Sequence, residues 1–397
     1  MPFMTDYHQG TLEILSKLEG ELAQIGALTS RAAAVIRGGG TVWTSMNSGH
    51  MPIAEQADDR RGSPGLLKSD GDFELLQAGD MVFTQRCNRD VLAARQRGVY
   101  VVCVTTNYQD NEFRPAGFTD ISHSNPDGLM LGDVSNEILH SHVPYQQGLV
   151  WCKEIADFAL CPSSTTGSAT VHWLINAELT HKVGNEGAAE VGPSAEYLRI
   201  LRERVEKVAQ HQEAIGETAA LMSERVLEGG RWFAQSLEHA GFYSEFNVAS
   251  GPRIVNTGDW AAHLDKNIML ISAISPAFAG EIELAQAKKG EGAYLIGIGP
   301  AGLDGEVPQP NLLGLADAPF DNFSPESGGV IEASGHTGGI CPTSGVVGNV
   351  IQQMISAQWA EEMVKRGAVP TFLRGVYQNG GTEYNTEMET VFAQRGY

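Results

Sequence analysis

The stretches that decide the fold are CPSSTTG at residues 161–167 and CPTSGVV at residues 341–347. Both open with cysteine, proline and two hydroxyl residues, and they begin 180 residues apart (341 minus 161) in a chain of 397. Each is followed by an apolar-rich run of helical character. A motif that recurs at a long interval indicates an internal repeat, and the elements around the two copies support that interpretation.

The first half of the chain alternates predicted helices and strands. Apolar residues at alternating three- and four-residue steps predict a helical stripe that ends at the glycines 38–40, formed by Leu15, Leu18, Leu22, Ile25 and Leu28. A helix is also expected at 89–98, and β-branched or apolar runs predict strands at 41–48, 79–87 and 99–107. Strands that alternate with helices are typical of an α/β domain with a parallel sheet.

The second half repeats this order of elements. A long helical stretch at 194–230 again ends in paired glycines, a further helix is expected at 280–292, and strands are expected at 231–236, 266–275 and 293–299. The sequence therefore predicts one α/β domain present twice, with a first domain at 1–185 and a second at 193–397. The segment 184–194 contains glycine, alanine and proline without periodicity, as a linker should. A single large α/β fold with accidental symmetry is the alternative.

Composition excludes several classes of partner. The chain is 42% hydrophobic with a net charge of −21, so nucleic acid and anionic membranes are poor partners. Backbone N–H groups and hydroxyls can still bind phosphate locally in an acidic protein. The five cysteines show neither disulfide-framework nor zinc spacing. No segment reaches the ~18 consecutive apolar residues of a membrane helix and the start of the chain shows no signal core, so a cytoplasmic protein is expected.

A small polar turn follows the first predicted strand. It offers hydroxyl, amide and backbone N–H groups ahead of the next helix, from Ser45, Asn47, Ser48, Gly49 and His50. Such a turn suits a phosphate, although an ordinary turn with a serine helix cap is the alternative. The second half has Glu238 at the equivalent point, which would repel a phosphate, so the first half is favoured here.

The next strand of each half also ends in a candidate loop. In the second half Ser272 and Ser275 alternate with apolar residues, and Glu281 lies about a turn into the following helix. Two hydroxyls beside a helix start can cradle a phosphate. The first half offers Arg86 and Arg89, which could hold an anion in bidentate fashion or pair with surface carboxylates.

The opening motifs place hydroxyls where helices begin. These residues are the third set of candidate ligands: Ser163, Ser164 and Thr165 in one copy, Thr343 and Ser344 in the other. Helix capping is the alternative for each of them. After the second copy, seven apolar residues share one predicted helical face: Val346, Val347, Val350, Ile351, Met354, Ile355 and Trp359.

The histidines do not predict a metal site. His140 and His142 are two residues apart, so they share no helix face and point to opposite sides of a strand, and His123 adds no matching acidic partner. We therefore expect neither a metal nor a cofactor.

Several of these stretches resemble one known family. The segment from Gly338 to Asn385, with its Pro-Thr-Ser turn and its Asn-Gly-Gly-Thr-Glu-Tyr-Asn tail at 379–385, resembles the end of SIS (sugar isomerase) phosphosugar-binding domains. Residues 38–56 and 78–106 resemble the family's glycine strand, Gly-His loop and following elements. The resemblance implies two tandem flavodoxin-like three-layer αβα sandwiches with parallel sheets, and a phosphorylated sugar or amino sugar bound at the strand ends.

The resemblance also suggests a reaction. Members of the family include aldose–ketose isomerases, and isomerisation needs a carboxylate base and an acid, for which Glu55, Glu281 and His50 are the candidates. Both glutamates could instead stabilise helix N-termini. The family's second loop reads Ser-x-Ser-Gly-x-Thr, whereas 84–89 and 272–277 keep neither the glycine nor the threonine. A non-catalytic phosphosugar sensor is therefore the alternative to a sugar-phosphate isomerase.

The repeat predicts how the two halves pack together and where a ligand binds. The stripe from Leu15 to Leu28 is expected to pack partly across an internal interface between the halves, or else only on its own sheet. The ligand should lie near that seam, with His50 close to Ser272 and Ser275. A homodimer is expected in addition, because two-fold pairing is the commonest oligomer.

Overall fold

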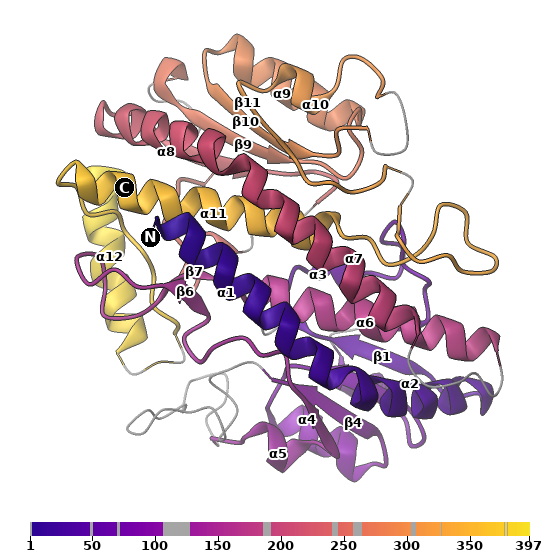
Figure 1. Ribbon diagram of the computed structural model, residues 1–397. Coiled ribbons are helices and arrows are strands. Elements are labelled where there is room, and N and C mark those ends of the chain that lie inside the picture. Colours follow the sequence, from indigo (N-terminus) through magenta and orange to yellow (C-terminus); the bar gives the residue numbers. More distant parts are fainter. Residues whose placement is uncertain are drawn as a thin grey trace.

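The computed structural model describes residues 2–47, 51–69, 72–105, 128–185, 192–239, 245–256, 264–302, 307–326, 328–376, 378 and 380–397. Within these residues the chain forms a five-stranded sheet, a four-stranded sheet and a small two-stranded sheet. The two larger sheets are parallel and lie on opposite sides of two long central helices (Figure 1). The prediction of two tandem α/β sandwiches with parallel sheets is confirmed.

The first sheet has the strand order β2-β1-β3-β4-β5. Its strands are β1 (Val42–Ser45), β2 (Leu67–Ser69), β3 (Met81–Thr84), β4 (Tyr100–Val104) and β5 (Glu137–Leu139). The helices between and after them are α3 (Ile53–Gln56), α4 (Arg89–Gln96) and α5 (Leu131–Val134), with a 3-10 turn at Phe73–Leu75. The side chains of β3 are buried throughout, as expected for a strand covered on both faces.

The second sheet has the strand order β11-β10-β9-β8. Its strands are β8 (Trp232–Gln235), β9 (Ile268–Ser272), β10 (Tyr294–Gly299) and β11 (Ala318–Asp321). The helices α9 (Ala279–Gly290) and α10 (Leu312–Leu315) belong to the same half, and a 3-10 turn at Leu264–Lys266 precedes β9. The small antiparallel pair joins β6 (Gly148–Val150) to β7 (Leu160–Pro162), and α12 (Gly381–Arg395) ends the chain.

The two central helices begin at the stretches that open the chain's repeat. They are α6 (Ser164–Gly184) and α11 (Ser344–Lys365), and they contact each other between the sheets. The apolar residues of α11 were expected on one face, but this helix is buried on nearly every side, including the polar Asn349, Gln352 and Gln353. All seven apolar residues of the predicted face are buried, and burial extends beyond that face because α11 contacts helices and strands on its other sides.

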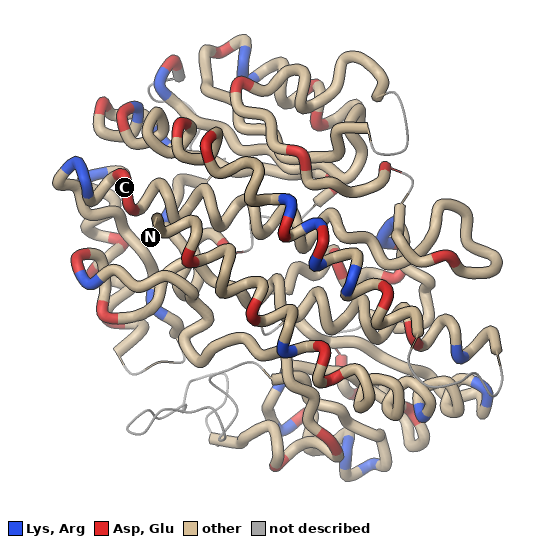
Figure 2. The backbone as a smooth tube through the Cα atoms, viewed as in Figure 1, with Lys and Arg blue, Asp and Glu red and all other residues tan. Residues whose placement is uncertain are grey.

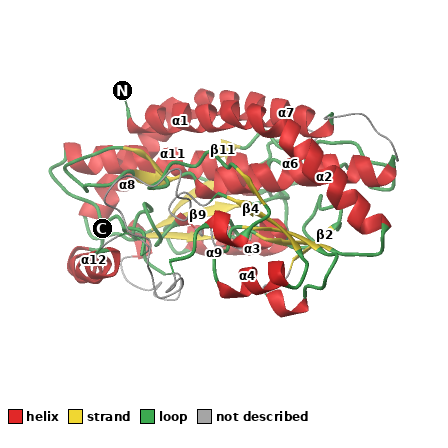
Figure 3. Cartoon of the chain, turned by 90° about the horizontal axis from the view of Figure 1, so that it is seen from below, coloured by secondary structure: helices red, strands yellow, loops and turns green. Residues whose placement is uncertain are grey.

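Four outer helices cover the central pair. They are α1 (Phe3–Leu18), α2 (Leu22–Arg37), α7 (Pro193–Lys207) and α8 (Gln212–Leu227), with 3-10 turns at Glu19–Glu21 and Val208–His211 joining each pair. Charged residues of both signs recur along α7 (Figure 2). Figure 3 shows α1 and α7 as the outer layer over α6 and α11.

The first helix of each half crosses to the other half. α2 packs on α6 and α8 on α11, which keeps these contacts within one half, but α1 packs chiefly on α11 and α7 on α6. Leu15 and Leu18 of α1 are fully buried, whereas Ile25 and Leu28 belong to α2. The prediction that this stripe packs partly across the internal interface is therefore confirmed.

The stretches 161–167 and 341–347 are fixed by the same kind of backbone hydrogen bond. Cys161 and Cys341 are both buried with φ of 60°, the left-handed region that non-glycine residues rarely adopt. The backbone N–H of Cys161 donates to the carbonyl of Ser250 at 2.7 Å, and that of Cys341 donates to the carbonyl of Gly62 at 2.9 Å. Each bond joins one half of the chain to the other. The exchange is reciprocal, so each half fixes the backbone that starts the other half's central helix.

Gly148 and Gly329 lie where the backbone of another segment comes very close, so substitutions there test the packing. A Cβ added at Gly148 would lie 2.2 Å from the carbonyl oxygen of Ala159, and one added at Gly329 would lie 1.9 Å from the carbonyl carbon of Ile340. We expect Gly148→Ala and Gly329→Ala each to lower the free energy of unfolding by about 1–3 kcal/mol or more, because backbone must move. Gly216→Ala is the control: it lies in α8 with nothing within 4 Å, and should raise that free energy by about 0.5–1 kcal/mol. Urea titrations measure all three, and unchanged stability of Gly329→Ala would contradict the packing described.

Candidate functional site

Side chains from both halves of the chain meet at the carboxyl ends of β8 and β9. In open parallel sheets this edge is where ligands bind. We call the group the seam cluster and define it as Glu55, Arg60 and Arg61 of the first half with His239, Ser272, Ser275 and Ser344 of the second. Hydrogen bonds between the halves connect these residues.

His239 lies at the centre of the seam cluster. Its Nδ1 is 3.0 Å from the Ser272 hydroxyl and its Nε2 is 3.2 Å from the Ser344 hydroxyl. Burial, and then the nearby Arg60 guanidinium, lower the pKa of this imidazole well below its usual value. The ring is therefore neutral at physiological pH, with one nitrogen able to donate and the other able to accept. It fixes the direction of both hydroxyls.

A buried ion pair brings positive charge to the same place. The Arg60 guanidinium donates to Glu55 Oε1 from Nη2 at 3.1 Å and from Nε at 3.2 Å, and both side chains are at most 5% exposed. The Arg60 Nη2 also donates to the Ser344 hydroxyl at 3.3 Å. Gly345 permits this approach, because a Cβ there would lie 2.6 Å from the Glu55 carboxyl carbon. The start of α11 is thus packed against a carboxylate from the other half.

The loop after β9 is held by a carboxylate and a guanidinium. Glu238 accepts from the Ser275 backbone N–H at 2.6 Å and from its hydroxyl at 2.8 Å. Arg61 donates to the same hydroxyl at 2.6 Å. In this conformation an internal carboxylate occupies the donors that an anionic ligand would need.

Glu281 supports this loop from the start of α9. Its Oε1 accepts from the backbone N–H groups of Leu237 at 2.6 Å and Glu238 at 3.2 Å, and from the Ser236 hydroxyl at 3.3 Å. Burial raises the pKa of Glu281, while the Leu237 N–H works in the opposite direction. Its Oε2 is buried without a hydrogen-bond partner among the described residues.

The first half has a related arrangement at the start of α6. Glu245 of the second half accepts from the Thr165 backbone N–H at 2.5 Å and from the Ser164 hydroxyl at 3.0 Å. Its other oxygen accepts from Asn349 at 2.8 Å. Burial raises the pKa of Glu245, with the Thr165 N–H opposing that shift. Each central helix therefore begins against a glutamate from the opposite half, but only Glu55 is paired with an arginine in the described residues.

The other described candidates from the sequence lie outside the seam cluster. Ser48, Gly49 and His50 are outside the described residues. Ser45 is buried at the end of β1, and Asn47 accepts from Arg86 at 3.5 Å. Ser163 donates to the carbonyl of Gln147 at 2.8 Å, and Thr343 accepts from Arg204. Neither Ser163 nor Thr343 caps its helix through its side chain.

Sequence reasoning missed four residues that the structure brings into these clusters: Arg60, Arg61, His239 and Glu245. A signal for two of them was present, because His239 precedes Glu245 by six residues, much as His50 precedes Glu55 by five. Comparison of the two halves at this point would have identified them. The arginines carry no such local signal, since they lie in a loop after α3 and the serines that they contact in the second half are more than 200 residues away.

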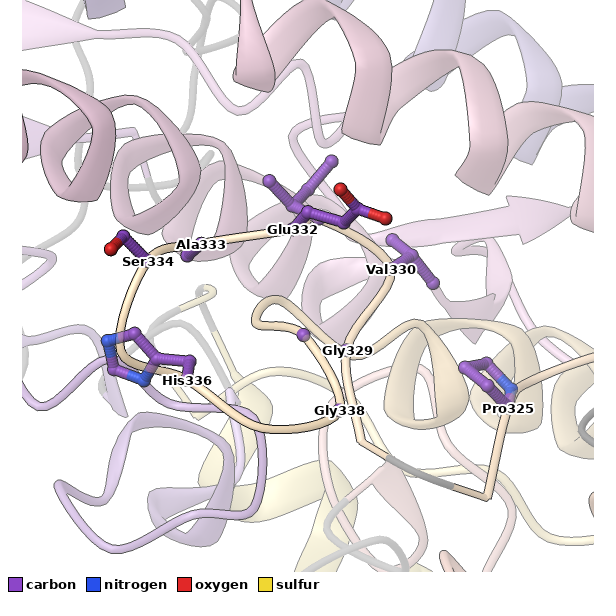
Figure 4. A pocket seen from close by; sticks show the side chains of 10 residues that line it. Pro325, Gly329, Val330, Glu332, Ala333, Ser334, His336 and Gly338 are labelled. Carbon is purple, nitrogen blue, oxygen red and sulfur yellow. The ribbon is translucent and has the colours of Figure 1, made fainter.

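A cavity of about 790 Å³ lies within the loop between β11 and α11 (Figure 4). Three of its ten lining residues are glycines, and Glu332, Ser334 and His336 supply the polar side chains around it. The loop adjoins the first half, because a Cβ on Gly62 would meet Pro342 at 3.0 Å and the Gly329 nitrogen at 3.4 Å. The cavity is thus next to the segment that carries Arg60 and Arg61.

The described residues contain no cluster of three or more histidine, cysteine, aspartate or glutamate side chains arranged to hold a metal. His142 instead pairs with Glu21 at 2.9 Å. None of the helices in the described part of the chain combines the length and the apolar character that crossing a bilayer requires.

The depressed pKa of His239 predicts an acid-dependent loss of stability. The native imidazole resists protonation, whereas the unfolded one titrates near its model value of 6.5. Unfolding then takes up a proton below that pH, so the free energy of unfolding falls as pH falls, by up to about 1.4 kcal/mol per pH unit. Urea titrations at pH 7, 6 and 5 should show a steeper loss for the wild type than for His239→Gln.

The same comparison controls for other groups. His172, whose pKa burial lowers to about 3, and the carboxyls of Glu245 and Glu281, whose raised pKa values act in the opposite sense, are present in both proteins. Their contributions cancel in the difference. Equal slopes for the two proteins would contradict the buried, neutral state of His239.

No family model matches the chain. Among curated proteins, it is 31% identical over 121 residues to the UPF0309 protein of Listeria monocytogenes and 27% identical over 131 residues to the UPF0309 protein of Brucella anthropi. These matches cover 29% and 32% of this chain, and 51% and 54% of the relatives. The chain thus spans about half the length of the curated relatives it matches.

Two solved structures are similar over almost the whole chain. A candidate phosphosugar isomerase from Clostridium difficile gives a TM-score of 0.52 at 11% identity, covering 93% of this chain and 95% of its own. The C-terminal domain of glucosamine-fructose-6-phosphate aminotransferase from Francisella tularensis gives 0.51 at 11% identity, covering 93% and 98%. Similarity at this identity shows the fold alone, which is the arrangement of α/β sandwiches with parallel sheets that the sequence predicted.

Proposed function

We propose that the seam cluster binds a phosphorylated monosaccharide or amino sugar. The observation that carries this proposal is the convergence of three hydroxyls, a neutral imidazole and two guanidinium groups at the carboxyl ends of β8 and β9. A sugar needs both donors and acceptors for its hydroxyls, which neutral His239 and the serines supply. Its phosphate needs positive charge and N–H donors, which Arg61 and the Ser275 backbone supply.

Binding of the phosphate proceeds by exchange with Glu238. That carboxylate now accepts from the Ser275 N–H and hydroxyl, the same donors that a phosphate oxygen requires. An incoming phosphate dianion displaces it and gains the Arg61 guanidinium, which already reaches this hydroxyl. The sugar ring then extends toward His239, Ser272 and Ser344.

The solved structures support this class of ligand. The Clostridium difficile protein carries the description of a phosphosugar isomerase, and the Francisella tularensis domain belongs to an enzyme named for fructose-6-phosphate. Both share the fold of this chain. The substrate class inferred from the residues agrees with the ligands named for these two proteins.

We propose aldose–ketose isomerisation as the reaction. A carboxylate takes the proton from C2 of the open-chain aldose while an acid protonates O1, which gives an enediol. The carboxylate then returns its proton to C1 while the O2 proton passes to the conjugate base of the acid, which leaves atoms and charge balanced. Glu55 suits this role because its Oε1 is fixed by Arg60 while its Oε2 is buried without a hydrogen-bond partner among the described residues. Glu281 has the same one-sided pattern and is the second candidate base, and His50 stays the proposed acid.

A non-catalytic sensor is the second candidate function. This function is favoured because both candidate bases already have partners within the protein. Glu281 accepts hydrogen bonds from backbone N–H groups, and Glu55 forms an ion pair with Arg60. Such carboxylates stabilise the loop and helix starts whether or not chemistry follows. The seam cluster then reports the presence of a sugar phosphate without converting it.

We infer that the two halves derive from a duplication, with units at 1–185 and 193–397. Equivalent helices keep a constant offset, since α1 and α7 begin at 3 and 193 and α2 and α8 at 22 and 212. Equivalent tyrosines also make the same bond: Tyr7 donates to the carbonyl of Pro162 and Tyr197 to that of Pro342. These matched offsets and contacts support one framework that is present twice.

Ligand binding tests the proposal directly. Calorimetry with a panel of aldose, ketose and amino-sugar phosphates should identify at least one ligand, and Arg61→Gln should weaken it about tenfold or more through the loss of a charge-assisted hydrogen bond. Arg95→Gln is the matched control and should not change affinity, because Arg95 is a partly exposed arginine of α4 that donates to the carbonyl of Asp133. No response to any sugar phosphate at millimolar concentration would exclude this function.

Turnover separates the isomerase from the sensor. If the chain is an isomerase, Glu55→Gln and Glu281→Gln should each lower turnover by about a hundredfold, while Glu74→Gln on the surface should not. Glutamine keeps the acceptor for Arg60, and circular dichroism checks the fold. Full binding without any turnover in the wild type would favour the sensor, and full activity of both variants would remove these glutamates from the mechanism.

A further inference from the structure

A second cavity, of about 600 Å³, lies between α7 and the carboxyl ends of β10 and β11. Its size is within the range of small-molecule sites. Ile200, Phe323 and Val330 form an apolar wall, and Arg204 and Lys207 of α7 bring two positive charges to the lining. Val330, labelled in Figure 4, also borders the loop cavity, so the two cavities share one side of the same loop.

The acids that line this cavity are engaged elsewhere. Glu203 accepts from Arg199 at 2.6 Å, and Asp321 Oδ1 accepts from the backbone N–H groups of Ala301 at 3.1 Å and Phe323 at 2.9 Å. Lys207 forms no hydrogen bond or ion pair with any described residue. Lys207 is therefore a positive charge of the lining whose side chain pairs with no described carboxylate.

Arg204 connects the cavity to the start of α11. Its guanidinium donates to the hydroxyl of Thr343, which lies 3.0 Å from the hydroxyl of Ser324. Thr343 directly precedes Ser344 of the seam cluster. Arg204 is thus a direct link between the cavity and the residue that precedes the seam cluster in the chain.

Phe323 is held in an uncommon backbone conformation at the wall. Its φ is 52°, in the left-handed region that bulky residues avoid. Its ring stacks on His211 with centroids 5.3 Å apart and an interplanar angle of 14°. Strain of this kind persists where surrounding contacts enforce it, and it concentrates at ligand sites.

The first half lacks the same chemistry. At the offset of 190 residues, Arg204 corresponds to Ile14, which is buried, and Lys207 corresponds to Lys17. Near the equivalent of Phe323, His142 has a φ of 57° and pairs with Glu21 rather than stacking on an aromatic ring. The combination of two cations and an aromatic wall therefore belongs to the second half, where the repeated framework has been altered.

We propose that this cavity is a separate binding site for a small organic phosphate. Its phosphate contacts Arg204 and Lys207, which lie one helical turn apart, and its apolar part packs against Phe323 and Val330. The site is distinct from the seam cluster and does not depend on the ligand proposed there. Its occupancy loosens the bond from Arg204 to Thr343.

Phenyl phosphate is a suitable probe because it joins a phosphate to one apolar ring. Calorimetry on the full chain should show binding of phenyl phosphate, with phenol and inorganic phosphate each at least about tenfold weaker. Lys207→Gln and Arg204→Gln should each weaken phenyl phosphate about tenfold. Lys17→Gln, at the matched position of the first half, should bind like the wild type.

The outcomes separate this site from the seam cluster. Arg61→Gln should leave phenyl phosphate binding unchanged even where it weakens a sugar phosphate. Lys207 is exposed, so its substitution tests the site even if Arg204→Gln disturbs the fold. Wild-type affinity in both the Lys207 and Arg204 variants, or equal weakening by Lys17→Gln, would overturn the proposal.

Discussion

The structure depends on two backbone hydrogen bonds that the halves exchange, from Cys161 to Ser250 and from Cys341 to Gly62. Each bond fixes a left-handed residue immediately before a central helix, and so sets where that helix begins. The glutamate that meets each helix start comes from the same opposite-half segment, Glu55 ahead of Gly62 and Glu245 ahead of Ser250. The seam cluster is a product of this exchange, since neither half alone contains both its hydroxyls and its guanidinium groups.

The difference between the two helix starts explains why one end of the molecule is better equipped for an anion. Glu55 is buried with Arg60, so the pair carries no net charge and leaves Arg61 available beside Ser275. Glu245 is buried with neutral amides and hydroxyls, and burial raises its pKa. A buried carboxylate without a cation disfavours a second negative charge nearby. The same framework thus supports two electrostatic environments.

Much of the fold could be predicted from the sequence. Periodicity and glycine positions identified most strands and helices because these are local properties, and the repeated motif predicted the two sheets. The sequence predicted the apolar stripe of α1 but not that α11 is its partner, because an amphipathic stripe does not determine the element on which it packs. Less of the site could be predicted from the sequence. The positions of Ser272, Ser275, Ser344 and Glu55 after predicted strands made them candidates. Arg60 and His239 acquire their roles from contacts with residues more than 30 positions away.

The crossing of α1 also has a consequence for how the chain comes to be folded during synthesis. α1 leaves the ribosome long before the helix on which it packs, which spans Ser344–Lys365. Its apolar stripe, with Leu15 and Leu18, stays uncovered until then. Contacts of such long sequence separation form slowly and leave partly folded chains prone to association. Synthesis of the second half therefore supplies the helix that covers the apolar stripe of α1 and reduces the tendency of the first half to associate.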